Sequence, residues 1–208
     1  MAKRCDARCA YVASTEQVWA LHDAMPEHLR AAVLLGAFVG LRLAEVCGLR
    51  VSDVDFMRGI VSPAVQYPSE PLKSETSRTA VPIPASLAAE LSAHVARWRA
   101  DTLLTNEVGK QLSPTTLERA IRASRSRVPG LSPAFRFHDL RHYLASLLIA
   151  SGADVKVVQA RMRHASSKTT LDTYGHLWPD SDDSTRAAID VVIAARADNL
   201  RTAEGGGA

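Results

Sequence analysis

The chain has 208 residues, of which 47% are hydrophobic, and this is enough material for one domain with a core of its own. Its formal net charge is +3 and 20 of its 25 basic residues are arginine, so nucleic acid is permitted as a partner but not required. The three cysteines, Cys5, Cys9 and Cys47, form an odd set without zinc-like spacing, which argues against a disulfide framework and a structural metal.

The N-terminal stretch predicts a basic lead-in followed by a first helix. Residues 1–11 are charged and lack the long apolar core of a secretory signal. The run Ser14-Thr15-Glu16-Gln17 offers a helix N-cap and an acid ahead of the apolar positions Val18, Trp19 and Leu21. We therefore expect the first helix to begin near Thr15.

The next forty residues predict two further helices. One runs from about 26 to 39, where Gly40 breaks it, and a short one follows over 42–49. The longest apolar run, residues 31–41, has about half the length that a membrane span requires. It is interpreted as a buried helix, so we expect a cytoplasmic protein without a membrane partner.

The pattern then changes to short β-like pieces and back to helices. The expected strands are 51–56, 60–61 and 79–83. Pro82 and Pro84 suit an edge strand better than a central one. The expected later helices are 86–99, 114–126, 138–150, 154–162, 168–178 and 183–198.

These elements predict an α+β fold that is mainly α-helical, with a small antiparallel sheet or hairpin region at about 51–83. The expected organisation is a lead-in over 1–11, one domain over 12–180, and a C-terminal helix with a flexible tail over 181–208.

The first motif that could carry chemistry is Phe137-His138-Asp139-Leu140-Arg141-His142, at the start of a helix. At about 100° per residue, His138 and Arg141 fall on the face opposite the leucines. Two phosphate ligands would then project from a helix N-terminus, where the helix dipole favours an anion. A solvated helix face without function is the alternative interpretation.

The second motif places Arg42 and Glu45 three residues apart in strongly apolar surroundings. A buried arginine is costly unless it has a partner or a function. The pair is either purely structural, or the carboxylate holds Arg42 in place for an anion; the two interpretations are compatible.

The third motif ends in Tyr174, which follows His164 by ten residues. Tyr174 shares a helix face with Leu171 and Trp178, so a core tyrosine is the alternative to a nucleophile. Gly175 weakens the helix beside it.

In this order the three motifs resemble the boxes of the tyrosine recombinase, or phage integrase, family. The resemblance covers about residues 12–178 and includes the text around Pro71-Leu72-Lys73-Ser74 and Thr169-Thr170-Leu171-Asp172-Thr173-Tyr174. It implies the catalytic-domain fold of that family. The positions that match its catalytic pattern are Arg42, Lys73, His138, Arg141, His164 and Tyr174.

The resemblance implies a role for each of these positions. Arg42 and Arg141 would clamp the non-bridging phosphate oxygens, with His164 as a further donor. Glu45 would orient Arg42 without transferring a proton.

Proton transfer and covalent chemistry fall to the remaining three residues. His138 would be a general acid or base near the nucleophile, and Lys73 the acid that protonates the departing 5′ oxygen. Tyr174 would carry the 3′ phosphate, so the resemblance implies neither ATP, nor a metal, nor another cofactor.

Four more arginines are candidates for contact with DNA. Arg119, Arg122 and Arg125 recur at helical spacing and would either meet the DNA backbone or form a solvated basic face. Arg163 stands where the family usually has a glycine, and it would either crowd the site or add to phosphate binding.

The resemblance also implies partners. The substrate would be double-stranded DNA with attachment-type recombination sites, to which a nucleoid-associated homo-tetramer would bind, its C-terminal tails docking in cis or in trans. Family members generally carry a core-binding domain ahead of the catalytic one, so we expect this chain alone to be monomeric or weakly associating and to bind DNA weakly.

Three alternatives stay open from the sequence. A DNA-binding remnant would retain the fold without turnover, and a type IB topoisomerase would relax DNA with the same residues. A metallonuclease is disfavoured by the lack of clustered carboxylates.

Overall fold

The computed structural model describes residues 11–72 and 74–178. The chain divides into two compact units, Met1–Gly175 and His176–Ala208, and the described part of the second is limited to residues 176–178. The lead-in before residue 11, Lys73 and the predicted helix 183–198 lie outside the described residues. Within them the predicted fold class is confirmed, with helices predominating and a small antiparallel sheet.

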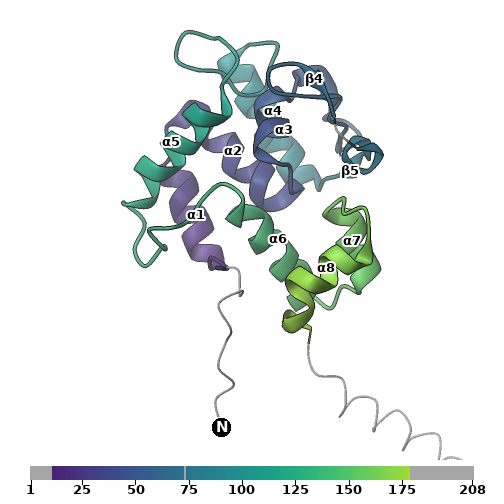
Figure 1. Cartoon of the computed structure of the whole chain (residues 1–208). Helices are drawn as coiled ribbons and strands as arrows, with labels where there is room; N and C mark the ends of the chain where they lie inside the picture. The colour runs from purple at the N-terminus through teal and green to yellow at the C-terminus, as the bar shows by residue number, and fades with distance from the viewer. Residues whose placement is uncertain (1–10, 73, 179–208) are drawn as a thin grey trace, which may run out of the picture. The chain divides into compact units, whose positions relative to one another are not determined.

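Helix α1, Thr15–Ala24, begins where the sequence predicts. The Ser14 side chain accepts a hydrogen bond from the Gln17 backbone N–H, and the Gln17 side chain accepts one from the Ser14 N–H. This reciprocal capping satisfies two of the N–H groups that a helix start leaves without partners. The buried face of α1 packs on α2 and α5, as Figure 1 shows.

The predicted helix 26–39 is present as three connected turns. A 3-10 turn, Glu27–Leu29, leads into α2, Arg30–Leu34, and a π-helical turn, Leu35–Val39, ends at Gly40. The apolar run is buried as expected, and α6 packs directly against the π-helical turn. Helix α3, Leu43–Gly48, follows at once. The core therefore reaches the residue that precedes Arg42.

The sheet is smaller than the sequence predicts. Strands β1, Val54–Asp55, β2, Ile60–Val61, and β5, Val81–Pro82, pair antiparallel in the order β1-β2-β5. The edge position predicted for the proline-containing strand is confirmed, because Pro82 lies on β5.

The prediction of one strand over 51–56 is wrong for its first half. Val51–Asp53 forms a 3-10 turn, because the Asp53 carboxylate accepts a hydrogen bond from the Arg50 N–H and caps the turn. A second ribbon, which the sequence did not predict, pairs β3, Val65–Gln66, with β4, Glu70–Pro71.

The later helices follow the predicted order, with ends defined by caps. They are α4, Ala85–Trp98; α5, Pro114–Arg125; α6, Asp139–Ala150; α7, Val155–Arg161; and α8, Ser167–Tyr174. The predicted helix 168–178 is therefore too long: α8 ends at Tyr174, and Gly175–Leu177 forms a 3-10 turn. The tyrosine thus lies at the last residue of a helix, beside the glycine that weakens it.

Gly40 permits the close approach of α6 to the start of the Arg42 motif. Its φ is +74°, and a Cβ there would lie 2.8 Å from Cδ2 of Leu144. We expect Gly40→Ala to lower the free energy of unfolding by about 2–4 kcal/mol, from the left-handed backbone and the overpacking together. Urea unfolding measures this loss.

Gly152→Ala is the matched control for Gly40→Ala. Gly152 also has a positive φ, +86°, but nothing lies within 4 Å of a Cβ built there. It should lose only the backbone part, about 1–2 kcal/mol. Equal losses in the free energy of unfolding of the two variants would show that the Leu144 side chain moves away from the added Cβ without a cost in stability.

Candidate active site

Arg42 and Glu45 form the pair that their spacing suggests. Arg42 precedes α3 in an extended conformation, and its backbone N–H donates to Oε2 of Glu45 at 2.8 Å. Its Nη1 donates to Oε1 of Glu45 at 2.9 Å and to Oγ of Ser77 at 2.9 Å. The Arg42 side chain remains 40% exposed while that of Glu45 is only 2% exposed, so the carboxylate anchors a guanidinium that solvent still reaches.

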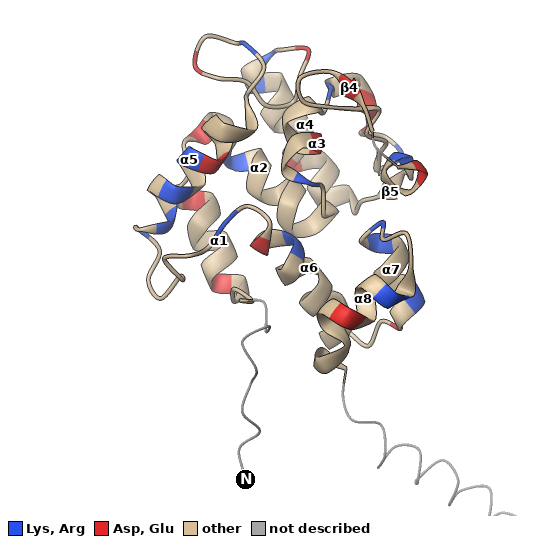
Figure 2. Ribbon diagram, in the orientation of Figure 1, with Lys and Arg blue, Asp and Glu red and all other residues tan. Residues whose placement is uncertain are grey.

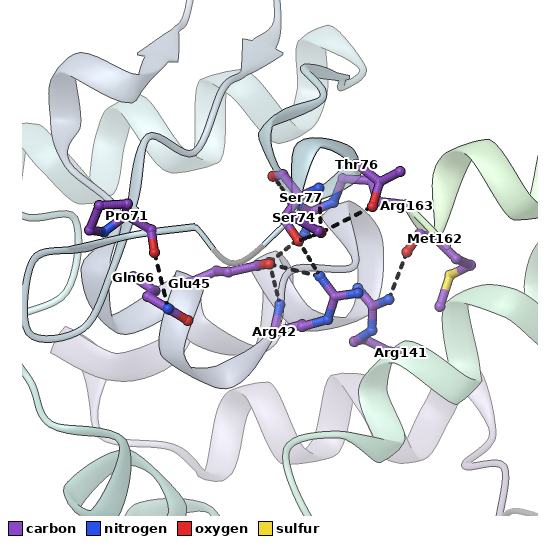
Figure 3. A network of polar contacts seen from close by, with 10 residues as sticks. All are labelled: Arg42, Glu45, Gln66, Pro71, Ser74, Thr76, Ser77, Arg141, Met162 and Arg163. Atoms are coloured by element: carbon purple, nitrogen blue, oxygen red, sulfur yellow. Dashed lines mark hydrogen bonds and ion pairs between the residues drawn. The ribbon is translucent and has the colours of Figure 1, made fainter. Parts of the chain in front are cut away.

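Arg163 approaches the same carboxylate from the interior (Figure 3). Its side chain is fully buried, Nη2 donates to Oε2 of Glu45, and Nη1 donates to the carbonyl of Ser77 at 2.6 Å. Burial raises the pKa of Glu45, but Arg163, the Arg42 N–H and the Arg42 charge outweigh it and hold that pKa below its ordinary value. Arg163 therefore holds Glu45 and Ser77 in place, and its hydrogen bonds are made to these two residues.

The backbone of Arg163 is unusual, because its φ is +51°, in the left-handed region that favours glycine. A glycine, the residue that the family resemblance implies here, would adopt this conformation without strain. Here the arginine adopts it and forms the buried ion pair with Glu45.

Ser77 connects this pair to the segment that follows Lys73. It lies on the 3-10 turn Glu75–Arg78, which the Ser74 hydroxyl caps by accepting from the Ser77 N–H. Ser77 was not among the predicted site residues, because a serine in a polar loop carries no distinctive signal. Lys73 itself is outside the described residues, but the turn beside it is bound to both Arg42 and Arg163.

Arg141 is buried, so the alternative interpretation of a solvated helix face does not hold for this residue. It is 2% exposed, whereas Leu147, predicted on the apolar face, is 40% exposed. The reason is that α7 also packs on α6. Arg141 Nη2 donates to the Met162 carbonyl at 2.8 Å, as Figure 3 shows, but its buried Nη1 has no partner among the described residues.

The surroundings of Arg141 disfavour its positive charge. Burial lowers the pKa of Arg141 to about 10, and the nearby positive charges of Arg42 and Arg163 contribute, while Glu45 and Tyr174 oppose them. An unpartnered, buried donor on a guanidinium is costly unless an anion satisfies it. The arrangement therefore suits an anionic ligand at Arg141.

Tyr174 meets histidines of α6. It is 3% exposed, and its hydroxyl lies 2.8 Å from Nδ1 of His142. The ring of His142 in turn lies against that of the exposed His138, with centroids 4.9 Å apart. His142 was not predicted as a site residue, although its spacing of four residues from His138 was a signal that both share a helix face.

These three groups are neutral near pH 7. Burial raises the pKa of Tyr174 to about 12, with Arg141 opposing the rise. Desolvation lowers the pKa of His138, helped by His142 and Arg141, and desolvation likewise lowers that of His142. The tyrosine therefore requires a proton acceptor to react as a nucleophile.

His164 completes the cluster. Its ring is parallel to that of Tyr174, with centroids 6.4 Å apart, and its Nδ1 lies 2.9 Å from Oγ1 of the buried Thr170. Burial lowers the pKa of His164 to about 4, and Arg141 and Arg42 add to the effect. His164 is thus a neutral ring, fixed in orientation, beside two guanidinium groups.

The arginines of α5 do not share one surface. Arg122 and Arg125 line a cavity of about 610 Å³ together with Arg136 and His138. Arg119 instead lines a separate cavity of about 470 Å³ whose other walls are mostly apolar. Helix α5 also carries one acidic residue, Glu118, among the basic ones (Figure 2). The structure therefore brings only two of the three arginines near His138.

Residues 11–72 and 74–178 contain no group of three or more His, Cys, Asp or Glu side chains placed to hold a metal ion. No helix in this part of the chain has both the length and the apolar character of a membrane span.

Comparison with known proteins gives consistent matches. Residues 12–180 match the model of the phage integrase family. Tyrosine recombinase XerA of Pyrococcus furiosus is 30% identical over 163 residues, which cover 74% of this chain and 54% of that protein. The crystal structure of XerA recombinase superposes with a TM-score of 0.69 at 22% identity, covering 90% of this chain and 65% of that one.

A second solved structure shows the same fold. The Tn1549 transposon integrase in complex with transposon right end DNA superposes with a TM-score of 0.71 at 17% identity, covering 91% of this chain and 68% of that one. The chain spans about half the length of the curated relatives that it matches.

Proposed function

The chain belongs to the phage integrase family, and we propose that it is the catalytic domain of a site-specific DNA recombinase that cuts and rejoins strands through a 3′-phosphotyrosyl link. The observation that carries this proposal is Arg141: a buried guanidinium with an unpartnered Nη1, beside Arg42 and next to Tyr174. A DNA phosphate is the anion that such a site would accept.

The arginines supply most of the stabilisation of the transition state. Attack on a phosphodiester places added negative charge on the non-bridging oxygens, so preorganised donors there accelerate the reaction. Arg42 and Arg141 are the donors, with Glu45 and Met162 holding them in place. His164, if the Thr170 hydroxyl donates to its Nδ1, carries its proton on Nε2 and donates from there.

The covalent step belongs to Tyr174. Its hydroxyl oxygen attacks the phosphorus, the 5′ oxygen leaves, and the resemblance assigns the protonation of that oxygen to Lys73. The phosphotyrosyl bond conserves the energy of the cleaved phosphodiester, so rejoining needs no ATP. Because the arginines provide the positive charge at the phosphate, the proposed mechanism has no step for a metal.

The proposed partners follow from the relatives. Two of the solved relatives are complexes with DNA: the Tn1549 transposon integrase with transposon right end DNA, and a lambda integrase dimer bound to a COC′ core site. We therefore propose double-stranded DNA as the substrate here, and a homo-tetramer on two duplexes as the recombining assembly. Arg122 and Arg125, and less directly Arg119, remain candidates for contacts with the backbone.

The proposal is tested by trapping the covalent link. The protein is incubated with a pool of nicked duplexes that carry random sequence around the nick, in the presence of a chelator, and run on a denaturing gel. We expect a DNA-linked protein band, and mass spectrometry should place the nucleotide on Tyr174. The matched control, Tyr174→Phe, removes only the hydroxyl and should give no band.

Two results would contradict the proposal. Absence of the band in the wild-type protein, at concentrations where it binds DNA, would favour a DNA-binding remnant. A band that persists in Tyr174→Phe would move the covalent link to another residue.

A further inference from the structure

The hydroxyl of Tyr174 has a partner to which neither the sequence motifs nor the resemblance gives a role. That partner is His142, whose Nδ1 lies 2.8 Å from the hydroxyl oxygen, within the range for direct proton transfer. The resemblance instead names His138 as the general acid or base. In the structure, however, the His138 ring contacts the ring of His142, and it is His142 that bonds to the Tyr174 hydroxyl.

We propose that His142 is a catalytic residue that accepts the proton of Tyr174 when the tyrosine attacks DNA. The inference rests on the proposed function of Tyr174 as the nucleophile. As the oxygen–phosphorus bond forms, the O–H bond breaks and its proton moves to Nδ1 of His142. The phosphorus–O5′ bond breaks, and O5′ takes its proton from a separate acid. In rejoining, His142 returns its proton to the tyrosine oxygen.

The surroundings of His142 suit this role. On its own helix, Asp139 favours the protonated ring, whereas burial and Arg141 favour the neutral one. Tyr174 faces it from α8, and His138 and His164 complete the charged and titratable groups around it. The neutral ring dominates at pH 7, and in its Nε2–H tautomer the Nδ1 lone pair faces the Tyr174 hydroxyl. Once protonated, the ring has the Asp139 carboxylate to stabilise it.

The tyrosine needs such an acceptor, because burial keeps its pKa near 12. Arg141 favours the phenolate, but not enough to ionise it at neutral pH. The hydrogen bond to His142 therefore joins a tyrosine that stays protonated at neutral pH to a neutral histidine that can accept the tyrosine's proton. Its geometry, a hydrogen bond between two facing helices, exists before DNA binds.

Two substitutions separate the role of His142 as a base from its role as a hydrogen-bond partner of Tyr174. His142→Asn keeps a polar atom near the position of Nδ1 but has no imidazole, and His142→Leu removes both. We expect both variants to form the covalent adduct about 10²–10⁴-fold more slowly than the wild type in single-turnover assays. His94→Leu is the matched control, because His94 is also half-buried but bonds to the Leu103 carbonyl elsewhere, and it should leave the rate unchanged.

A substrate with sulfur in place of the scissile 5′ oxygen isolates the nucleophile. A thiolate leaves without a proton, so a residue that only protonates the leaving group becomes dispensable on this substrate. We expect Lys73→Ala to recover on it, while the His142 variants stay slow. Above neutral pH the wild-type rate should be flat, and the rate of His142→Leu should rise about tenfold per pH unit as more tyrosinate forms.

The outcomes distinguish this inference from the proposed function. If the wild type forms no adduct, the nucleophilic role of Tyr174 fails, and this inference fails with it. If the wild type forms the adduct and folded His142→Leu matches or exceeds its rate, only the inference fails, and the hydrogen bond merely holds the tyrosine. Recovery of His142→Leu on the sulfur substrate would also overturn it, because His142 would then act on the leaving group.

Discussion

Replacing Arg141 by alanine is expected to slow formation of the covalent adduct by about 10²–10³-fold or more. The variant loses both the buried positive charge and the Nη1 donor that has no partner within the described protein. Single-turnover cleavage of the nicked substrate measures the effect. Stability should change little, because the lost bond to the Met162 carbonyl is offset by relief of repulsion from Arg42 and Arg163.

Arg141→Lys is the matched control for this substitution. Lysine keeps the positive charge but not the planar fork that donates to two acceptors at once. Its rate should therefore lie between those of the wild type and Arg141→Ala. A fully active, folded Arg141→Ala would contradict the assignment of the phosphate site to this guanidinium.

Replacing Glu45 by alanine is expected to lower the free energy of unfolding by about 3–5 kcal/mol. The carboxylate is the ion-pair partner of the fully buried Arg163 and also accepts two bonds from Arg42. Its removal leaves Arg163 buried without a counter-charge and releases Arg42 from its position. Urea unfolding should show the loss, and cleavage should slow as well.

The pH dependence of stability checks the same ion pair. The folded-state pKa of Glu45 is lowered, so its contribution is complete above the ordinary glutamate value of 4.5 and is lost as pH falls through the folded-state pKa. The difference in stability between the wild type and Glu45→Gln should therefore be largest near neutrality and shrink in acid. A difference that stays constant into acid would contradict the lowered pKa.

A double variant separates charge from packing. Glu45→Gln combined with Arg163→Met removes both members of the buried pair, so no unpaired charge is left in the interior. It should recover part of the stability that Glu45→Gln alone loses. If the double variant is less stable than Glu45→Gln, the ion pair with Glu45 does not account for the burial of Arg163.

Local rules predicted the elements well, because caps and breakers act over a few residues. The Ser14 cap places the start of α1, and Gly40, with its left-handed φ, ends the helical run before Arg42. Pro82 correctly marks an edge strand. The same rules failed at Val51–Asp53, where one side-chain cap was enough to convert an apparent strand into a turn.

The spacing of Arg42 and Glu45 predicted their local contact, but no spacing predicted the contacts between distant segments of the candidate site. The alternative of a solvated face for Arg141 assumes that only one side of a helix is covered, whereas α7 covers a second side of α6. The Arg163–Glu45 pair joins residues 118 positions apart, a distance at which no local pattern operates. The contact of His142 with Tyr174 likewise depends on how α8 docks.

The sharing of Glu45 makes the alignment of the arginines depend on the folding of the chain. One carboxylate accepts from Arg42 and Arg163, and Ser77 accepts from the same two arginines. The bonds between Arg42 and Glu45 are local, but those that Ser77 and Arg163 add form only when three distant stretches of chain have come together. Under the proposed function, a nascent or partly unfolded chain is therefore expected to lack the aligned guanidinium groups and to cut no DNA.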